Sequence, residues 1–340
     1  MAKTKHGLPE TKGQFKLRGL VTGMLRDDTY SSKKTKTGND RRVLKFGVQT
    51  APESTVYVTV QGMEMDNVYF SKRSEVKNQP SEIKKVKWND RFNDQEEGFK
   101  LIGVGVGLDK DENGKNIIYT MTDYDAAKFI YEKLEDETPV FIRGQIEFSH
   151  YKNDNDEVIR SKKFVIKNIY NSKSIDFDAE DFKETSDFKQ RIIFMGIEKV
   201  DDKNDPRFLV EAKVVTYGSV EDVEFVVRDK SLANTLRANL KPYSAIEVWG
   251  NIYNKLDSEE IKSEKKSVWG QEDSFKKVNG TYIRELVITG ADPESIDKDT
   301  YSEEKIDEAL RALKEFGENE SRSNVWGTEN KADENDDLPW

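Results

Sequence analysis

One pattern of residues occurs twice in the chain, and this repeat limits the fold more than any other feature. A helix-like run, with apolar side chains three or four residues apart, is followed by a proline and then by a strand-like run. This arrangement occurs at 125–146 and again at 232–252. The same 106 positions separate Leu134 from Leu240 in the helices and Gly144 from Gly250 in the strands. A duplicated structural unit is therefore expected.

Strand-like runs surround each helix in the same order, with three before it and two after it. Besides the repeated strand, the runs are 15–24, 42–49, 55–61 and 164–169 in the first copy and 191–197, 208–215, 223–227 and 285–289 in the second. Three strands, a helix and two strands form the order of the OB fold, a small barrel that binds oligonucleotides. We therefore predict a mainly β protein with two OB-fold barrels in tandem, a C-terminal helix and a disordered acidic tail.

The remaining segments are placed around these barrels by their composition. The predicted regions are a basic N-terminal arm at 1–12, a first OB domain at 13–172 with an insertion at about 70–123, a linker at 173–186, a second OB domain at 187–296, a helix at 297–317 and a disordered acidic tail at 318–340. Ser302 is a suitable N-cap for the helix and Gly317 a suitable C-cap. We expect its apolar face to dock on the second barrel or on a second subunit.

Composition excludes several kinds of chemistry. The chain has no cysteine, which excludes disulfides, thiolate zinc sites and cysteine nucleophiles, and its two histidines are His6 and His150. No apolar run is long enough to span a bilayer, and the N-terminus lacks the apolar core of a secretory signal. We expect a cytoplasmic protein, in the host cytoplasm if a phage encodes it, with no membrane partner, no cofactor, no metal and no catalytic residue.

Two stretches resemble ligand-binding motifs only in part. The glycine-rich run 103–107 lacks the third glycine of a dinucleotide fingerprint, because Leu108 follows it. The run 109–114 begins like a calcium loop, but Thr120 occupies the position of the required glutamate. We interpret the first as a strand of small residues and the second as a hairpin turn.

Charge is distributed unevenly along the chain. The net charge is −10, yet the first 50 residues hold twelve Lys and Arg against four acidic residues, whereas residues 318–340 hold two against seven. The chain therefore begins basic and ends acidic.

The last five residues form the most specific motif. They are Asp336, Asp337, Leu338, Pro339 and Trp340. This end resembles the acidic tip of bacterial and bacteriophage single-stranded DNA-binding proteins, with Trp340 in place of the usual phenylalanine and Leu338 in place of a common isoleucine. The resemblance, which is closer to a phage-type member, implies that these five residues bind partner proteins. An aromatic wedge, a free carboxylate and preceding acids suit a small apolar pocket with a basic rim.

Binding of a DNA single strand requires cations for the phosphates and aromatic faces for the bases. Alternation along the strands of the first barrel places several such residues on one face, away from the core. The predicted DNA contacts are Lys16, Arg18, Lys33, Lys34, Lys36, Arg41, Arg42, Lys45, Tyr57, Trp88, Arg91, Phe92, Phe141, Arg143, Tyr151 and Trp249.

These observations favour a protein that coats and protects single-stranded DNA, independently of sequence, in replication, recombination and repair. Its acidic tip would recruit a helicase, a polymerase or repair enzymes, and a homo-oligomer is compatible with the sequence. Two alternatives remain open. One is a protein-interaction scaffold with OB-like domains, and the other is a metal-dependent nuclease built from the many carboxylates.

Overall fold

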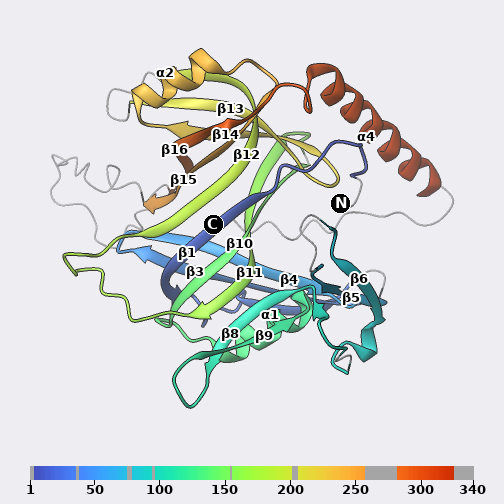
Figure 1. Ribbon diagram of the computed structural model, residues 1–340, viewed down its shortest axis with the longest axis vertical. Coiled ribbons are helices and arrows are strands. Elements are labelled where there is room, and N and C mark those ends of the chain that lie inside the picture. The colour runs from blue at the N-terminus through green and yellow to red at the C-terminus, as the bar shows by residue number, and fades with distance from the viewer. Residues whose placement is uncertain are drawn as a thin grey trace, which may run out of the picture.

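The computed structural model describes residues 4–35, 38–74, 79–93, 96–153, 155–200, 206–256 and 282–324. The protein is mainly β, and Figure 1 shows its second barrel above the first. No helix of the described part is long and apolar enough to cross a membrane.

Five strands close the first barrel. They are β1 (Gly13–Thr22), β3 (Asp40–Ala51), β4 (Ser54–Met63), β10 (Pro139–Lys152) and β11 (Val158–Asn171). Their neighbours in space are β1–β3–β4–β11–β10 and again β1, and the β4–β11 pairing is parallel. Helix α1 (Asp123–Lys133) precedes β10. This is the strand order of an OB barrel.

The second barrel repeats this order. Its strands are β12 (Thr185–Val200), β13 (Arg207–Val215), β14 (Val220–Val227), β15 (Ser244–Leu256) and β16 (Tyr282–Asp297), and α2 (Lys230–Asn239) lies between β14 and β15. The parallel pair is again the third strand with the fifth, β14 with β16. The fold class predicted from the repeat is confirmed.

The repeated residues have the same local roles in both barrels. Thr122 and Asp229 cap the two helices by accepting the backbone N–H groups three residues later. Gly144 and Gly250 lie where a Cβ atom would meet a carbonyl oxygen of the adjacent strand, at 2.0 and 1.9 Å. Any side chain at these positions would force the strands apart, which explains why glycine recurs at the fixed offset.

The two barrels share one sheet and one hydrophobic cluster. Strand β1 pairs with β12 from Gly13↔Gln190 to Arg18↔Thr185, so hydrogen bonds continue from one barrel into the other. Phe148 lies on the part of β10 that extends beyond the first barrel, and its ring packs edge-on against Phe225 in the second. The barrels are therefore held together by backbone and side-chain contacts.

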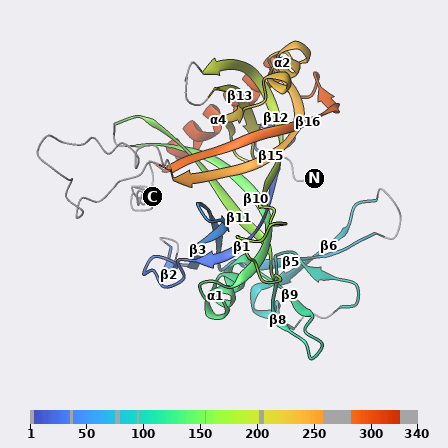
Figure 2. The ribbon, with the colours of Figure 1, turned by 90° about the vertical axis from the view of Figure 1, so that its left-hand side faces the viewer.

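The first barrel also has an insertion and one additional short strand. The insertion contains β5 (Asn67–Lys72), β6 (Glu82–Lys87), a 3-10 turn η1 (Trp88–Asp90), β7 (Lys100–Leu101), β8 (Val104–Lys110) and β9 (Asn116–Met121), and the connection between β1 and β3 contains β2 (Tyr30–Lys34). Strands β5, β6 and β7 form a separate small sheet, and Figure 2 shows the β5–β6 hairpin projecting from the body of the barrel. The glycine run lies largely in β8, and Asp111–Gly114 turns the chain into β9.

Both ends of the described chain pack on the second barrel. Leu8 from the N-terminal arm and Ile306 from helix α4 (Glu303–Asn324) lie in one buried cluster with Ile193. Helix α4 continues past Gly317, the glycine at which the helix was predicted to end, and reaches Asn324. A glycine inside a helix costs only about 1 kcal/mol relative to alanine, which is too little to end a helix by itself.

Candidate nucleic-acid interface

The outer face of β2, β3 and β4 holds four of the predicted DNA contacts, Lys33, Arg41, Lys45 and Tyr57. Leu44, Phe46 and Val48 of β3 are fully buried in the barrel. The intervening residues therefore point outward, and the strand register places them in rows across the three strands. The rows are Lys33, Arg41 and Met63, then Ser31, Val43 and Gln61, then Lys45 and Thr59, and finally Gly47 and Tyr57. Lys34, the residue after Lys33, points to the other face of β2 and lies opposite Asp40.

The two lysines of this face have no carboxylate partner among the described residues. Lys33 and Lys45 make no ion pair there, while Arg41 donates a hydrogen bond to the neutral side chain of Gln61 at 3.2 Å. Lys36 lies outside the described residues. A polyanion would meet these lysines without first displacing a carboxylate.

An aromatic ring lies diagonally next to Lys45. Tyr57 is 37% exposed, and the guanidinium of Arg26 lies 5.5 Å from its ring centroid. Arg26 was not among the predicted contacts, because nothing in the loop sequence indicates that it folds over β4. A planar base could stack on such a ring, with the arginine close to the sugar–phosphate chain.

A second surface crosses from one barrel to the other. It is a groove of about 720 Å³ over the outer side of β10, β1, β12 and β15. Lys16, Arg143 and Trp249 from the predicted set line it, and the indole of Trp249 lies against Gly290, where a Cβ atom would come within 2.5 Å of Nε1. The groove therefore requires both barrels and their β1–β12 pairing.

Most cations of this groove already have carboxylate partners. Lys16 pairs with Asp187 at 3.0 Å, and two lysines that were not predicted, Lys189 and Lys167, pair with acidic residues at 2.5 and 3.1 Å. Alternation with the buried Phe188 could have indicated that Lys189 faces outward, but not that β12 adjoins β1. A nucleic acid would have to displace these partly exposed ion pairs and would leave the carboxylates next to its phosphates, so the groove is the weaker candidate of the two surfaces.

Two further predicted contacts lie near the groove. Arg18 donates hydrogen bonds to the hydroxyl of Ser172 and to the carbonyl of Ser174, which fixes the linker to β1. Phe141 is half-buried, and the guanidinium of Arg143 lies 5.2 Å from its ring centroid.

Four of the predicted contacts lie apart from both surfaces. Arg91 pairs with Asp125 of α1 through two hydrogen bonds of 2.8 and 3.1 Å, and its guanidinium stacks on Trp88. Arg42 stacks on Tyr124 at 3.7 Å from the ring centroid. Burial raises the pKa of the Tyr124 hydroxyl, and Arg42 opposes this rise. These contacts hold the insertion and β3 against helix α1, and Phe92, beside Arg91, is exposed.

The counterpart of the first barrel's outer face is acidic in the second barrel. On β13 and β14, Glu211 lies directly opposite Glu224, and Lys213 lies opposite Asp222, with which it pairs at 2.5 Å. Like charges in directly opposed positions destabilise a sheet. This face lacks the excess of positive charge that a phosphate backbone requires.

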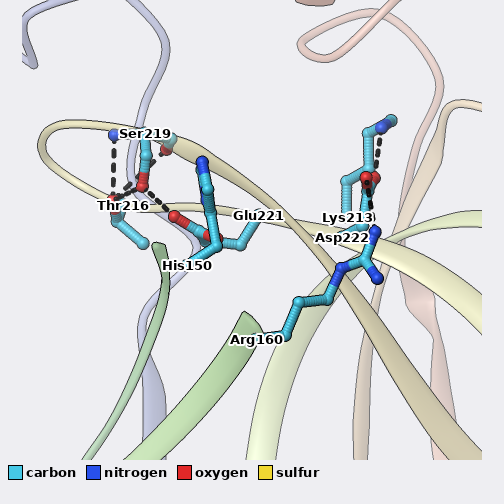
Figure 3. A network of polar contacts seen from close by, with 7 residues as sticks. All are labelled: His150, Arg160, Lys213, Thr216, Ser219, Glu221 and Asp222. Carbon is cyan, nitrogen blue, oxygen red and sulfur yellow. Dashed lines mark hydrogen bonds and ion pairs between the residues drawn. The ribbon is translucent and has the colours of Figure 1, made fainter. Parts of the chain in front are cut away.

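The long β10–β11 hairpin of the first barrel lines one pocket together with β13 and β14, and Figure 3 shows His150 beside Glu221 and Arg160 beside Asp222. His150 Nδ1 is 2.6 Å from the buried carboxylate of Glu221, which also accepts a hydrogen bond from Ser219. Arg160 pairs with Asp222 at 3.5 Å. Tyr151, the remaining predicted contact, is exposed near the tip of the same hairpin.

The described residues contain no cluster of three or more histidine and carboxylate side chains that could hold a metal ion. In the run 109–114, which begins like a calcium loop, the carboxylate of Asp111 accepts hydrogen bonds from the backbone N–H groups of Asn113 and Lys115. These bonds stabilise the β8–β9 turn.

Comparisons with known proteins identify a family, and the similar solved structures include two forms of one protein. No curated protein matches the chain. The wild-type single-stranded DNA binding protein from Thermus aquaticus is 10% identical, with a TM-score of 0.40 over 84% of this chain and 93% of that chain. A deletion mutant of the same protein, also 10% identical, has a TM-score of 0.41 over 83% and 94%. The family model described as YorF matches residues 72–323, which is well over half of the sequence, and the chain therefore belongs to the YorF family.

Proposed function

We propose that this protein binds single-stranded DNA on the outer face of its first barrel, without sequence preference. The observation that carries the proposal is a row of outward cations, Lys33, Arg41 and Lys45, that leads along β2 and β3 to the exposed ring of Tyr57, with Lys45 diagonally next to that ring. This is the face of an OB barrel, formed by its second and third strands, that commonly receives oligonucleotides.

The chemistry of this face favours a single strand over a duplex. The face of a tyrosine ring can be used only by a base that is not already stacked and paired. Lysine contacts with phosphates carry no sequence information, so binding should be general. Each neutralised phosphate releases counterions, so binding should weaken steeply as salt increases.

The groove across both barrels extends this site. Outward residues of β1 run from Lys16 to Thr22, and Thr22 lies next to Gly47 in the same row as Tyr57. Six residues of strand cover about 20 Å. A bound strand could therefore pass from the β3–β4 face along β1 to Trp249, with weaker contacts in the groove.

A titration tests the DNA-binding proposal directly. Fluorescein-labelled oligo-dT and a duplex of equal length would be titrated with the full chain at low and high salt, with anisotropy as the readout. We expect tight binding to the single strand, a large loss at high salt, and weak binding to the duplex. Absence of binding to oligo-dT at low salt would refute the proposal and favour a protein-interaction scaffold.

The biological role that we propose is coating and protecting single strands in replication, recombination and repair. The terminal residues Asp336, Asp337, Leu338, Pro339 and Trp340 would recruit partner proteins, a helicase, a polymerase or repair enzymes; these residues lie outside the described part of the chain. Deletion of 331–340 should leave DNA affinity unchanged or increased, because an acidic segment is removed, and should abolish recruitment. Lost DNA binding in this truncation would contradict the assignment.

A further inference from the structure

The small sheet of β5, β6 and β7 has two different faces. Val68, Phe70 and Val86 point to one side, where they form a buried cluster with Trp88, Phe99 and Leu101. The alternate residues point to the other side. These alternate residues are Asn67, Tyr69 and Ser71 on β5, Ile83, Lys85 and Lys87 on β6, and Lys100 on β7.

Three lysines surround one aromatic ring on this exposed face. Lys85 lies directly opposite Tyr69, which is 47% exposed, and Lys87 lies opposite Asn67, diagonally next to Tyr69. Lys100 pairs in register with Ser71 and so occupies the diagonal position on the other side. Directly opposed side chains are about 5 Å apart and diagonal ones about 7 to 8 Å, so one ligand can contact all four residues.

The lysines of this face have no carboxylate partner among the described residues. Lys85, Lys87 and Lys100 form no ion pair there, whereas Lys84, on the opposite face, pairs with Glu96 at 2.6 Å. The two faces of one sheet thus differ in chemistry. One is apolar with paired charge, and the other places three ammonium groups, unpaired within the described part of the chain, around an exposed ring.

We propose that this exposed face, Tyr69 with Lys85, Lys87 and Lys100, is a second contact site for single-stranded DNA. The inference rests on the proposed function. Phosphates bind the three lysines and one base stacks on Tyr69, which is the combination that sequence-independent single-strand binding uses. The site continues the first, because β4 ends the β3–β4 face at Met63 and β5 begins at Asn67. The insertion therefore lengthens the DNA track beyond the barrel.

Two oligonucleotide lengths test the site. An oligo-dT of about 12 nucleotides fits one OB barrel, and one of about 40 nucleotides can reach beyond it. For the longer strand, K85Q/K87Q/K100Q should make the slope of log K against log[salt] shallower by about 2, since each phosphate contact on a single strand contributes about 0.7. Tyr69→Ala should weaken binding of the longer strand about five- to hundredfold. Neither variant should change binding of the short strand.

A charge-matched variant controls for the general electrostatic field. K230Q/K241Q/K314Q removes three exposed lysines from α2, the following turn and α4. It should retain the wild-type salt slope, and thermal unfolding should verify the fold of each variant. If the wild type binds both strands and the β6–β7 variant keeps the wild-type slope and affinity, this second site is refuted while the proposed function stands. If the wild type binds neither strand, both are refuted.

Discussion

The two barrels have the same strand order but opposite chemistry on the same face. In the first barrel, the second and third strands, β3 and β4, present Arg41, Lys45 and Tyr57 to solvent, and Lys33 of the adjoining β2 lies opposite Arg41. In the second barrel, the equivalent strands present Glu211 opposite Glu224, and a hairpin from the first barrel lines one pocket together with these strands. The fold is duplicated, and the candidate binding surface is not.

This difference shows that two copies of one fold in a chain can have different functions. Function belongs to the side chains on a fold and not to the fold itself. The β10–β11 hairpin of the first barrel contacts both sides of β14, because Arg160 pairs with Asp222 on the acidic face and His150 lies 2.6 Å from Glu221, which is buried on the core side. We infer that the second barrel orients the first and completes the groove, while the first barrel carries the principal contacts with DNA.

The largest expected effect concerns the joint between the barrels. Phe148 is almost fully buried and packs on Phe225 across the joint. Phe148→Ala should lower the free energy of unfolding by about 3 to 5 kcal/mol, because it leaves a cavity in the shared cluster. Denaturant unfolding would measure the loss, with Tyr151→Ala at the exposed hairpin tip as the control. Equal, small losses in both variants would show that the hairpin is not a structural joint.

The next largest effect is expected from reversing the charges on the corresponding faces of the two barrels. K33E/K45E places acidic residues on the face of the first barrel and should lower oligo-dT affinity by about a hundredfold or more, since each charge-assisted contact contributes about 1.5 to 3 kcal/mol. The counterpart E211K/E224K, in the second barrel, should leave affinity unchanged. Anisotropy titrations would compare them. A gain of affinity in the second variant, without a loss in the first, would reverse the roles assigned to the barrels.

A smaller effect would show whether the β3–β4 face or the groove contributes more to the binding free energy. Tyr57→Ala should cost about 1 to 3 kcal/mol of binding free energy, the usual range for one stacked base. Trp249→Ala should cost less, because the lysines around Trp249 are paired with carboxylates. Tyr57→Phe retains the ring and serves as the control. A larger loss at Trp249 than at Tyr57 would make the groove the principal contact.

Local patterns predicted much of the fold. Apolar periodicity and the position of proline indicate helices α1 and α2, and the glycines at a fixed offset mark the same close approach of strands in both barrels. The pairing of β1 with β12, and the packing of Leu8 on the second barrel, join residues far apart in sequence. No local pattern encodes such contacts.

For the candidate site, the sequence predicted which side chains face outward but not which of them are covered by other parts of the chain. Alternation correctly separates Lys45 from the buried Leu44 and Phe46. Alternation does not show what lies above an outward side chain. Arg42 stacks on Tyr124 and Arg91 pairs with Asp125, because the insertion and helix α1 fold against that part of the barrel.

The smallest effect tests how the hairpin lies against the second barrel. Burial lowers the pKa of Lys162 to about 8, an effect that Glu285 opposes and Arg284 reinforces, and its ammonium donates a hydrogen bond to the Arg284 carbonyl at 3.0 Å. Between pH 8 and the ordinary value of 10.5, the unfolded chain binds more protons than the folded one at this residue, so its contribution to stability rises with pH. The side chain is only partly buried, so the rise should be on the order of 1 kcal/mol.

Lys162→Met should lack this rise, whereas Lys163→Met, at the exposed neighbouring position, should retain it. Denaturant unfolding of both variants and the wild type at several pH values from 7.5 to 10 would measure how the free energy of unfolding changes with pH. This range begins just below the pKa of about 8. Parallel curves for all three proteins would mean that Lys162 remains hydrated. The hairpin would then lie more loosely on the acidic face than the structure indicates, and that face would be open to another ligand.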